Sequence, residues 1–312
     1  MFKKENTAFN YIITVHNKEI LIKDVILSVI SCMGENSTIY PILDGCTDCS
    51  EEIIDQLITE FPEKRIVKLY ADDVHELKSI NVGLSASNQD GLGFNIVLQD
   101  DVLIKDTLIE DHCLMLFNKF KNLGVVSFRH GGNLSRKLLT KNTSIKPIVD
   151  YVENEMGHNP DPFYQLKIGS FIFKEVAIKS PICIPCHVIR EVGMPDEIYA
   201  PWDDLAYCYN VAQSGFHNGV YALDFQSDVE WGTTRKKKQT VGISEVEKKN
   251  LKLFKLKNKI IAPLNANIYS SKRYQIFDNG KVYKASYFLN LVSIIKMTLN
   301  TVKIKFKILI LK

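Results

Sequence analysis

The feature that most constrains the fold is a regular alternation of apolar runs and helical patterns through the first 129 residues. The runs are rich in residues that strands favour, and between them apolar side chains recur at helical spacing. Strands that alternate with helices form a mostly parallel sheet covered on both faces, which predicts an α/β fold. The predicted strands are 9–15, 38–44, 65–70, 94–100 and 124–129, and the predicted helices are 22–30, 50–60, 76–87 and 107–121.

The second part of the body is less regular. Residues 130–165 are polar and predict an insertion or a long loop beside the site. After it we expect a strand at 167–173, a short helix at 187–193, a helix from Asp203 to a stop at Gly215, and a strand at 217–225.

Polar residues follow several of the predicted strands. In a parallel sheet ligands bind at the carboxyl ends of the strands, so these residues predict a site. An aspartate at a strand end is also a common turn residue, which is the alternative for any one of them. Carboxylates that end three strands favour the site: the polar residues are His16–Asn17, Asp44, Asp72–Asp73 and Asp100–Asp101.

Two pairs of adjacent carboxylates suggest chemistry. At Asp100–Asp101, one acid could bind a divalent cation together with substrate phosphates, and the other could accept hydrogen bonds from a ligand hydroxyl. Asp203–Asp204 begin a predicted helix, where capping is the alternative role. The helix dipole is expected to lower the pKa of Asp204 and keep it ionised as a base.

The charge distribution is strongly asymmetric. The net charge of +3 divides into −13 for residues 1–231 and +16 for residues 232–312. This excludes a uniformly basic nucleic-acid binder and indicates an acidic globular body with a basic tail for an anionic surface. No run of 18 uncharged apolar residues and no signal peptide is present, so we expect a cytoplasmic protein.

Seven cysteines agree with a reducing compartment. Cys46/Cys49 and Cys183/Cys186 are CxxC pairs that could form a zinc site, and the second pair precedes His187 as in c-type haem attachment. Because the pairs lie far apart in the chain, buried free thiols are the favoured interpretation.

Five motifs in order resemble glycosyltransferase family 2, whose members have the GT-A fold, and together they span about 9–225. YIITVHNKE resembles the opening strand and its turn, PILDGCTDCS the VVDDGSTDGT motif, and KSINVG the A-R-N-x-G segment. VLQDDV resembles the metal-binding DxD strand end, and REVGMPDEIYAPWDDLAYCYNVAQSGF resembles the region that carries the catalytic base.

The resemblance implies roles for individual residues. Asp204 would be the catalytic base, Asp101 would ligate Mn²⁺ or Mg²⁺, and Asp100 would hold the ribose or the sugar. The remaining donor contacts implied or suggested are Thr14, His16, Asn17, Asp44, Lys78, Asn81 and Arg235.

Three positions depart from the family pattern. Leu43 and Gln99 stand where the family has carboxylates, so the metal would rest on Asp101, phosphate oxygens and waters. Ile80 stands at the arginine position, where Lys78 could substitute.

The resemblance and the tail lead to a domain prediction: a GT-A catalytic domain at 1–231, a basic lid or linker at 232–284, and a basic amphipathic helix at 285–312. In the lid, Arg235 could reach the diphosphate, although a solvated linker is the alternative. The terminal helix predicts binding to an anionic membrane surface, with packing on the domain or a strand as alternatives. Its apolar stripe is Phe288, Val292, Ile295, Leu299, Val302, Phe306 and Leu309.

The predicted function is that of an inverting, metal-dependent hexosyltransferase in surface polysaccharide synthesis. The donor would be a nucleotide-diphosphate sugar, expected to be a UDP-sugar, and the acceptor a hydroxyl of a glycan or a lipid-linked glycan. The expected location is the inner face of the cell membrane. The alternatives are a nucleotidyltransferase that makes a nucleotide sugar, and a non-catalytic membrane-associated protein on a degenerate transferase fold.

Overall fold

A computed structural model describes residues 2–74, 76–87, 91–134, 148–157, 165–197, 203–227, 273–276 and 282–284. The described helices carry the apolar stripes that the sequence predicts. They are α1 (Ile22–Ile30), α2 (Ser50–Glu60), α3 (Glu76–Ala86), α4 (Ile109–Lys119), α6 (Cys186–Val192) and α7 (Asp203–Gln213), preceded by a 3₁₀ turn, η1 (Lys4–Asn6).

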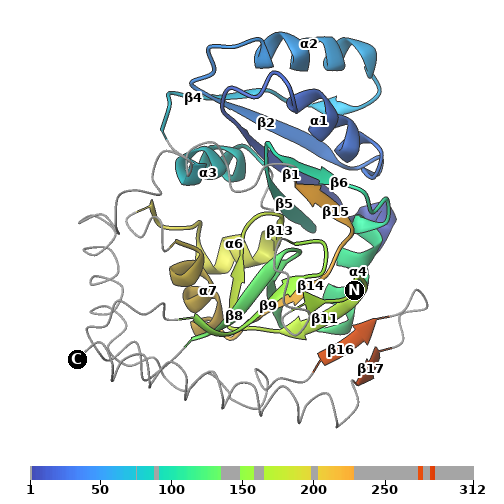
Figure 1. Ribbon diagram of the computed structural model, residues 1–312, viewed down its shortest axis with the longest axis vertical. Coiled ribbons are helices and arrows are strands. Elements are labelled where there is room, and N and C mark those ends of the chain that lie inside the picture. Colours follow the sequence, from blue (N-terminus) through green and yellow to red (C-terminus); the bar gives the residue numbers. More distant parts are fainter. Residues whose placement is uncertain are drawn as a thin grey trace.

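An eleven-stranded sheet forms the centre of the molecule (Figure 1). Its first part is parallel, with the order β3-β2-β1-β5, and β4 also pairs with β2. These strands are β1 (Ala8–Val15), β2 (Thr38–Asp44), β3 (Arg65–Ile66), β4 (Leu69–Ala71) and β5 (Gly93–Gln99).

The second part of the sheet continues from β5 in the order β13-β7-β14-β11-β16-β17. β13, β11 and β17 run against the other eight strands, so the sheet is mostly parallel, as the sequence predicts. These strands are β7 (Leu123–Ser127), β11 (Ser170–Phe173), β13 (Ile182–Pro185), β14 (His217–Tyr221), β16 (Arg273–Ile276) and β17 (Val282–Lys284). The last two lie within 232–284, predicted as a lid or linker, and extend the sheet at its edge.

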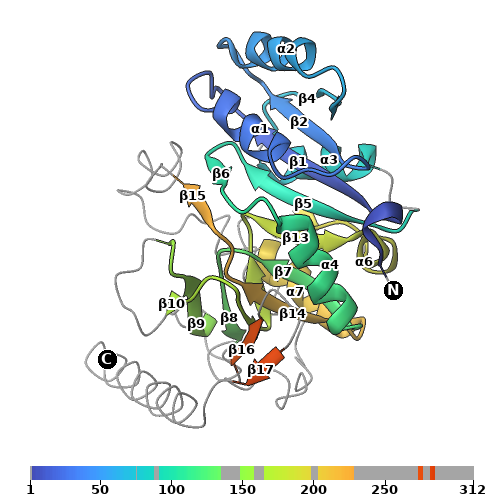
Figure 2. The same ribbon diagram turned by 90° about the vertical axis from the view of Figure 1, so that its right-hand side faces the viewer.

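Two smaller sheets lie beside the central one (Figure 2). One has four strands in the order β10-β9-β8-β12, and the other pairs β15 with β6. Their strands are β6 (Val102–Ile104), β8 (His130–Leu134), β9 (Ile148–Asn154), β10 (Gln165–Leu166), β12 (Val176–Ile178) and β15 (Phe225–Ser227).

The helices cover both faces of the sheet because successive strand side chains point to opposite sides. Tyr11 and Ile13 of β1 pack in a cluster with α1, α2 and α4, whereas Ile12 packs in a second cluster with α3, α6 and α7. The predicted site lies at the carboxyl ends of β1, β2 and β5, between these two layers of helices.

Three local predictions are wrong. Residues 130–165 are not irregular throughout, because β8 and β9 pair within them. The strand predicted at 65–70 is divided into β3 and β4, and the division lies opposite Pro41, a residue that cannot donate a ladder hydrogen bond. The short strand β13, between two prolines, was not predicted.

Two predicted segments lie outside the described residues: the position of Arg235 and the terminal segment 285–312. No helix in the described part of the chain is long and apolar enough to cross a membrane.

Candidate functional site

The site begins where β1, β2 and β5 end side by side. The register aligns Val15 with Leu43 and Thr14 with Gln99, so the next residues of the three strands are neighbours. The structure therefore brings His16, Asp44 and Asp100 to one edge of the sheet, as the sequence predicts. Thr14 is the penultimate residue of β1 and is buried.

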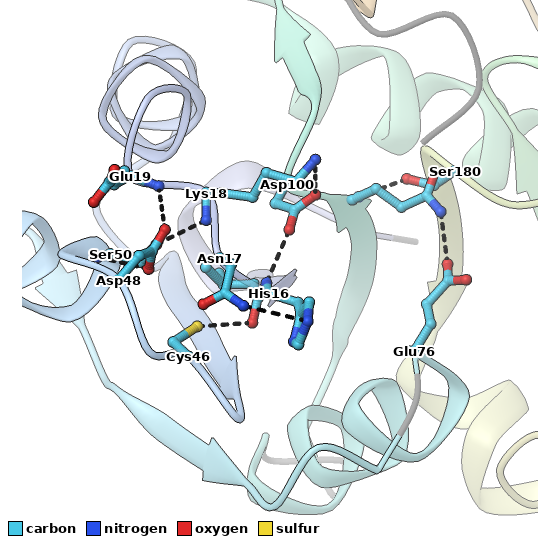
Figure 3. Close-up of polar contacts among 12 residues, drawn as sticks. His16, Asn17, Lys18, Glu19, Cys46, Asp48, Ser50, Glu76, Asp100 and Ser180 are labelled. Atoms are coloured by element: carbon cyan, nitrogen blue, oxygen red, sulfur yellow. Dashed lines mark hydrogen bonds and ion pairs between the residues drawn. The ribbon is translucent and has the colours of Figure 1, made fainter. Parts of the chain in front are cut away.

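Asp100 is the most connected acid at this edge (Figure 3). Its Oδ2 accepts a hydrogen bond of 2.9 Å from the backbone N–H of His16, and its Oδ1 lies 3.3 Å from Nζ of Lys18. The side chains of Lys18 and Asp100 are only 10 % and 14 % exposed. Burial raises the pKa of Asp100 from 3.8 to about 6, although Lys18 and the His16 N–H act in the opposite direction.

The loop after β1 is fastened to the loop after β2 (Figure 3). The backbone N–H of Lys18 donates to Oγ of Ser50 at 2.9 Å, and that of Glu19 donates to Oδ2 of Asp48 at 2.9 Å. Oδ1 of Asn17 accepts from the N–H of Thr47 at 2.8 Å, in the other direction across the loops. These bonds fix the loop that carries His16, so this part of the site is formed without a ligand.

Asn17 itself has a backbone φ of 51°, a left-handed conformation that asparagine tolerates better than most residues. Its predicted role as a donor contact therefore accompanies a clear structural role in the turn. The N-cap residue of α2 is Cys49, and the hydroxyl of Ser50 accepts from the backbone N–H of Lys18.

Asp44 is buried and holds the loop that follows β4. Its Oδ1 accepts from the N–H of Val74 at 2.8 Å, while its backbone carbonyl accepts from Nδ1 of His16 at 2.6 Å. Gly45 has φ 61°, and a Cβ there would lie 2.7 Å from Cβ of Asp73. Only glycine allows this approach, so the glycine of the PILDGC motif has a steric reason.

Asp101 differs from Asp100 in its hydrogen bonding. Its side chain is 8 % exposed, and its buried Oδ1 has no hydrogen-bond partner among the residues that the structure describes. Buried carboxylate oxygens are normally paired, so an orphaned one fits a ligand position for a hard cation. No cluster of three or more His, Cys, Asp or Glu side chains suited to a metal occurs in the described ranges, so Asp101 would need ligands from outside that set.

A second part of the site lies across α3. Gln99 donates from Nε2 to Oε1 of Glu76 at 2.9 Å, and its backbone N–H donates to Oγ of Ser180 at 2.8 Å. Oε1 of Glu76 lies 4.0 Å from Nζ of Lys179. Gln99 therefore links the end of β5 to the Glu76 and Lys179 pair.

The two aspartates of α7 complete this connection. Nζ of Lys179 is 2.6 Å from Oδ2 of buried Asp203, and the backbone N–H of Lys179 is 3.5 Å from Oδ1 of Asp204. Asp204 is more exposed than Asp203. Both acids lie in the first turn of the helix, and both contact Lys179.

The pKa of Asp204 is raised well above its usual value, contrary to the prediction that the helix dipole would lower it. Burial is the largest cause, and the charges of Asp203 and Glu76 add to it against the opposing effect of Lys179. A carboxylate with a raised pKa is a stronger base once it is ionised.

Two predicted donor residues are placed differently from the rest. Lys78 is exposed on α3. Asn81 donates from Nδ2 to the carbonyl of Pro195 at 3.0 Å and to Oε1 of Glu197 at 3.3 Å, so it tethers the segment that precedes α7.

Sequence reasoning missed Lys18, Glu76 and Lys179, which join the acids into one network. The position of Lys18 directly after the His16–Asn17 turn is a weak signal for its role. Lys179 is a lone cation in the apolar run VAIKSPICIP, and that isolation could have indicated a buried ion pair.

The cysteines are all free thiols. Five are buried, among them Cys183 and Cys186, whereas Cys49 is exposed. Burial raises the pKa of Cys186 to about 11, which makes it a poor thiolate ligand or nucleophile.

Comparisons with known proteins agree with the fold. A scan against models of protein families finds no match. A search of curated proteins finds none either. Among solved structures, TarS of S. aureus matches with a TM-score of 0.53 and 11 % identity, over 85 % of this chain and 42 % of TarS.

Two further structures match with TM-scores below 0.5. The mannosyltransferase PcManGT from Pyrobaculum calidifontis, in complex with GDP-Man and Mn²⁺, has a TM-score of 0.48 and 10 % identity over 70 % of this chain and 55 % of that one. S. aureus TarS 1–349 in complex with UDP has 0.45 and 12 %, over 72 % and 59 %. The chain thus spans about half the length of these structures, and the likeness to TarS supports the fold alone.

Proposed function

We propose that this protein is a glycosyltransferase that moves a sugar from a nucleotide-diphosphate sugar to a hydroxyl group of a glycan or lipid-linked acceptor. The observation that carries the proposal is a continuous polar network at the carboxyl edge of the sheet. It runs from His16 and Asp100 through Gln99 and Glu76 to Lys179 and the two aspartates of α7. Such edges are where α/β sheets bind ligands.

The donor would bind against the ends of β1, β2 and β5. Asp100 and the carboxylate of Asp44 offer acceptors for ribose hydroxyls or a base, and the cross-loop hydrogen bonds of the 16–19 segment hold these groups without ligand. Preorganised polar groups lose little conformational entropy when they bind a ligand. A UDP-sugar is the donor we would test first, on the family resemblance of the motifs.

Asp101 would hold a divalent cation, Mn²⁺ or Mg²⁺, which when bound neutralises the charge that grows on the departing diphosphate. The orphaned Oδ1 of Asp101 supports this assignment. Because no second carboxylate of the family pattern stands at Gln99, phosphate oxygens and waters would supply the remaining ligands.

Asp204 would accept the proton of the acceptor hydroxyl. That oxygen would form a bond to the anomeric carbon while the bond from this carbon to the diphosphate breaks, and the nucleoside diphosphate would leave with the electron pair. One displacement of this kind inverts the configuration of the sugar. The place of Asp204 in the polar network supports the role, because it is bound by the backbone N–H of Lys179 and is more exposed than Asp203.

The experiment is a panel of nucleotide sugars, with and without Mn²⁺, in which release of nucleoside diphosphate and transfer to acceptors are measured. Asp204→Asn should lower turnover by about 10²-fold or more and leave donor binding intact, because it removes proton transfer. Asp101→Ala should weaken Mn²⁺-dependent nucleotide binding in calorimetry. The control is Asp111→Asn, an exposed acid paired with Lys4 on the surface.

Three outcomes would count against the proposal. Pyrophosphate release from a nucleoside triphosphate would indicate the nucleotidyltransferase. Nucleotide binding without turnover of any donor would indicate the non-catalytic protein. Full turnover of Asp204→Asn would remove Asp204 as the base.

The location of the protein remains part of the proposal. The segment 285–312 carries five lysines and no acid, so it is suited to an anionic membrane surface, where a lipid-linked acceptor would be found. We propose peripheral attachment to the inner face of the cell membrane on that composition.

A further inference from the structure

Lys179 occupies an unusual position for a lysine. Its side chain is 16 % exposed, and its ammonium group is surrounded by three carboxylates that come from two helices. Nζ is 2.6 Å from Asp203 and 4.0 Å from Glu76, and the backbone N–H approaches Asp204 at 3.5 Å. These charges raise the pKa of Lys179 although burial alone would lower it, so it is a permanent cation.

The backbone around Lys179 is held on both sides. The N–H of Ala177 donates to Sγ of Cys208 at 3.3 Å, and the thiol donates back to the carbonyl of Ala177 at 3.3 Å. Oγ of Ser127 donates to the carbonyl of Ile178 at 2.6 Å. Ser180 accepts from the N–H of Gln99 at 2.8 Å. The segment 177–180 is therefore fixed to α7, β7 and β5, and the ion pair of 2.6 Å with Asp203 holds the ammonium group beside the acids.

We propose that Lys179 is a positioning residue that keeps Asp204 in place and ionised for the transfer step, an inference that rests on the proposed function. Every charged group facing Asp204 in the described chain takes part in this balance. Glu76 of α3 and Asp203 of α7 oppose its ionisation, and Lys179 favours it. The Cys208 thiol, also on α7, is neutral because burial raises its pKa.

The two acids at the start of α7 would have different roles. Asp203 forms the short ion pair with Lys179 and is buried, so it is occupied. Asp204 receives only a long backbone hydrogen bond from the same residue and is more exposed, so it is available to an acceptor hydroxyl. Lys179 thus pairs with Asp203 through its ammonium group and holds Asp204 through its backbone N–H, which leaves the carboxylate of Asp204 able to accept a proton.

The test is the pH dependence of kcat, measured between pH 5 and 9 on the full chain. Lys179→Met should move the acidic limb to higher pH by about one pH unit or more, because loss of a nearby positive charge disfavours the carboxylate. On the acidic side of the wild-type limb, turnover should therefore fall about tenfold or more, and it should recover at higher pH. Lys179→Arg should retain a limb close to that of the wild type.

The substitution Glu76→Gln should shift the acidic limb of the pH profile in the opposite direction. It removes a negative charge that faces Asp204, keeps an acceptor for Gln99, and lies at a side chain 37 % exposed, so it should fold. Its acidic limb should move to lower pH. Lys68→Met is the matched control, because Lys68 also pairs with two carboxylates, Glu51 and Asp55, at a distant surface position.

The outcomes separate the inference from the function on which it rests. If wild-type turnover is present but the limb is the same in Lys179→Met and Glu76→Gln, the inference is overturned and the function stands. If Lys179→Met does not fold, Glu76→Gln and Lys179→Arg decide in the same way. If no donor is turned over, the function fails, and a ¹³C NMR titration of Asp204 that is unaltered in Glu76→Gln would overturn the inference as well.

Discussion

The buried carboxyl group of Asp100 predicts how the free energy of unfolding depends on pH. Its carboxyl group binds a proton more tightly in the folded chain, where the pKa is about 6, than in the unfolded chain, where it is near 3.8. Acid therefore favours the folded state through this group. The stabilisation is complete below pH 3.8 and is lost as the pH rises through 6.

The interval between these pKa values gives the magnitude. At about 1.4 kcal/mol per pH unit, it corresponds to about 3 kcal/mol of the free energy of unfolding. Asp100→Asn removes the titration but keeps a carbonyl oxygen for the N–H of His16. The free energy of unfolding of the variant relative to the wild type should therefore rise by about 3 kcal/mol between pH 3.5 and pH 7.5.

Urea unfolding followed by far-UV circular dichroism, in EDTA, would measure this difference at each pH. Effects of the substitution that do not depend on pH, such as part of the loss at Lys18, cancel from the comparison. Asp111→Asn is the control, because its side chain is 41 % exposed and burial cannot penalise its charge in the same way. Parallel pH profiles for Asp100→Asn and the wild type would refute the reasoning, and would mean that Lys18 and the His16 N–H offset burial completely.

Two further predictions concern the packing of α3 and the terminal segment. Gly83→Ala should lower the free energy of unfolding by about 1–2 kcal/mol, because a Cβ would lie 2.5 Å from Cγ2 of Ile12. The cost of this overpacking exceeds the gain of about 1 kcal/mol in helix propensity. Chemical denaturation would measure the change, and Ser85→Ala, at an exposed position of the same helix, is the control. Deletion of 285–312 should release the protein from anionic liposomes in co-sedimentation, and zwitterionic liposomes should bind neither the deleted nor the intact chain. Equal binding of the two chains to anionic liposomes would contradict the membrane proposal.

The first half of the sheet could be predicted from the sequence because its strands are continuous apolar runs. β1, β2 and β5 lie within a residue or two of their predicted ranges, and so do α1 and α2. Buried parallel strands produce continuous apolar runs, and amphipathic helices produce apolar residues at helical spacing. The glycine at 83 also belongs to a recognisable motif, and the structure explains it by the close approach of α3 to β1.

The second half was harder to predict for physical reasons. β13 is four residues long and is preceded by a proline, so it is too short to show an alternating pattern of apolar and polar side chains. β8 contains two adjacent glycines and a histidine, and its pairing with β9 depends on partners that come later in the chain. Such non-local pairing leaves little local trace.

The site shows the same division between local and non-local information. Asp100, Asp101 and Asp204 stand in local motifs, so the sequence alone could nominate them. Lys179 is 24 residues away from its ion-pair partner, and only the fold makes them neighbours. The direction of the Asp204 pKa was also wrong, because a helix N-terminus can be read from sequence but burial among other acids cannot.

The contacts of the two network lysines bear on the charge asymmetry of the chain. Under the proposed function, an acidic body of net charge −13 would hold an anionic diphosphate, so it would need positive charge at the donor site. The two lysines of the polar network are already paired, Lys18 with Asp100 and Lys179 with Asp203, and releasing either would leave a carboxylate of low exposure without its partner. The required charge would then come from a cation at Asp101, from the basic segment that contains Arg235, or from both. This is why Asp101→Ala, rather than a lysine substitution, is the sharper test of how the diphosphate is bound.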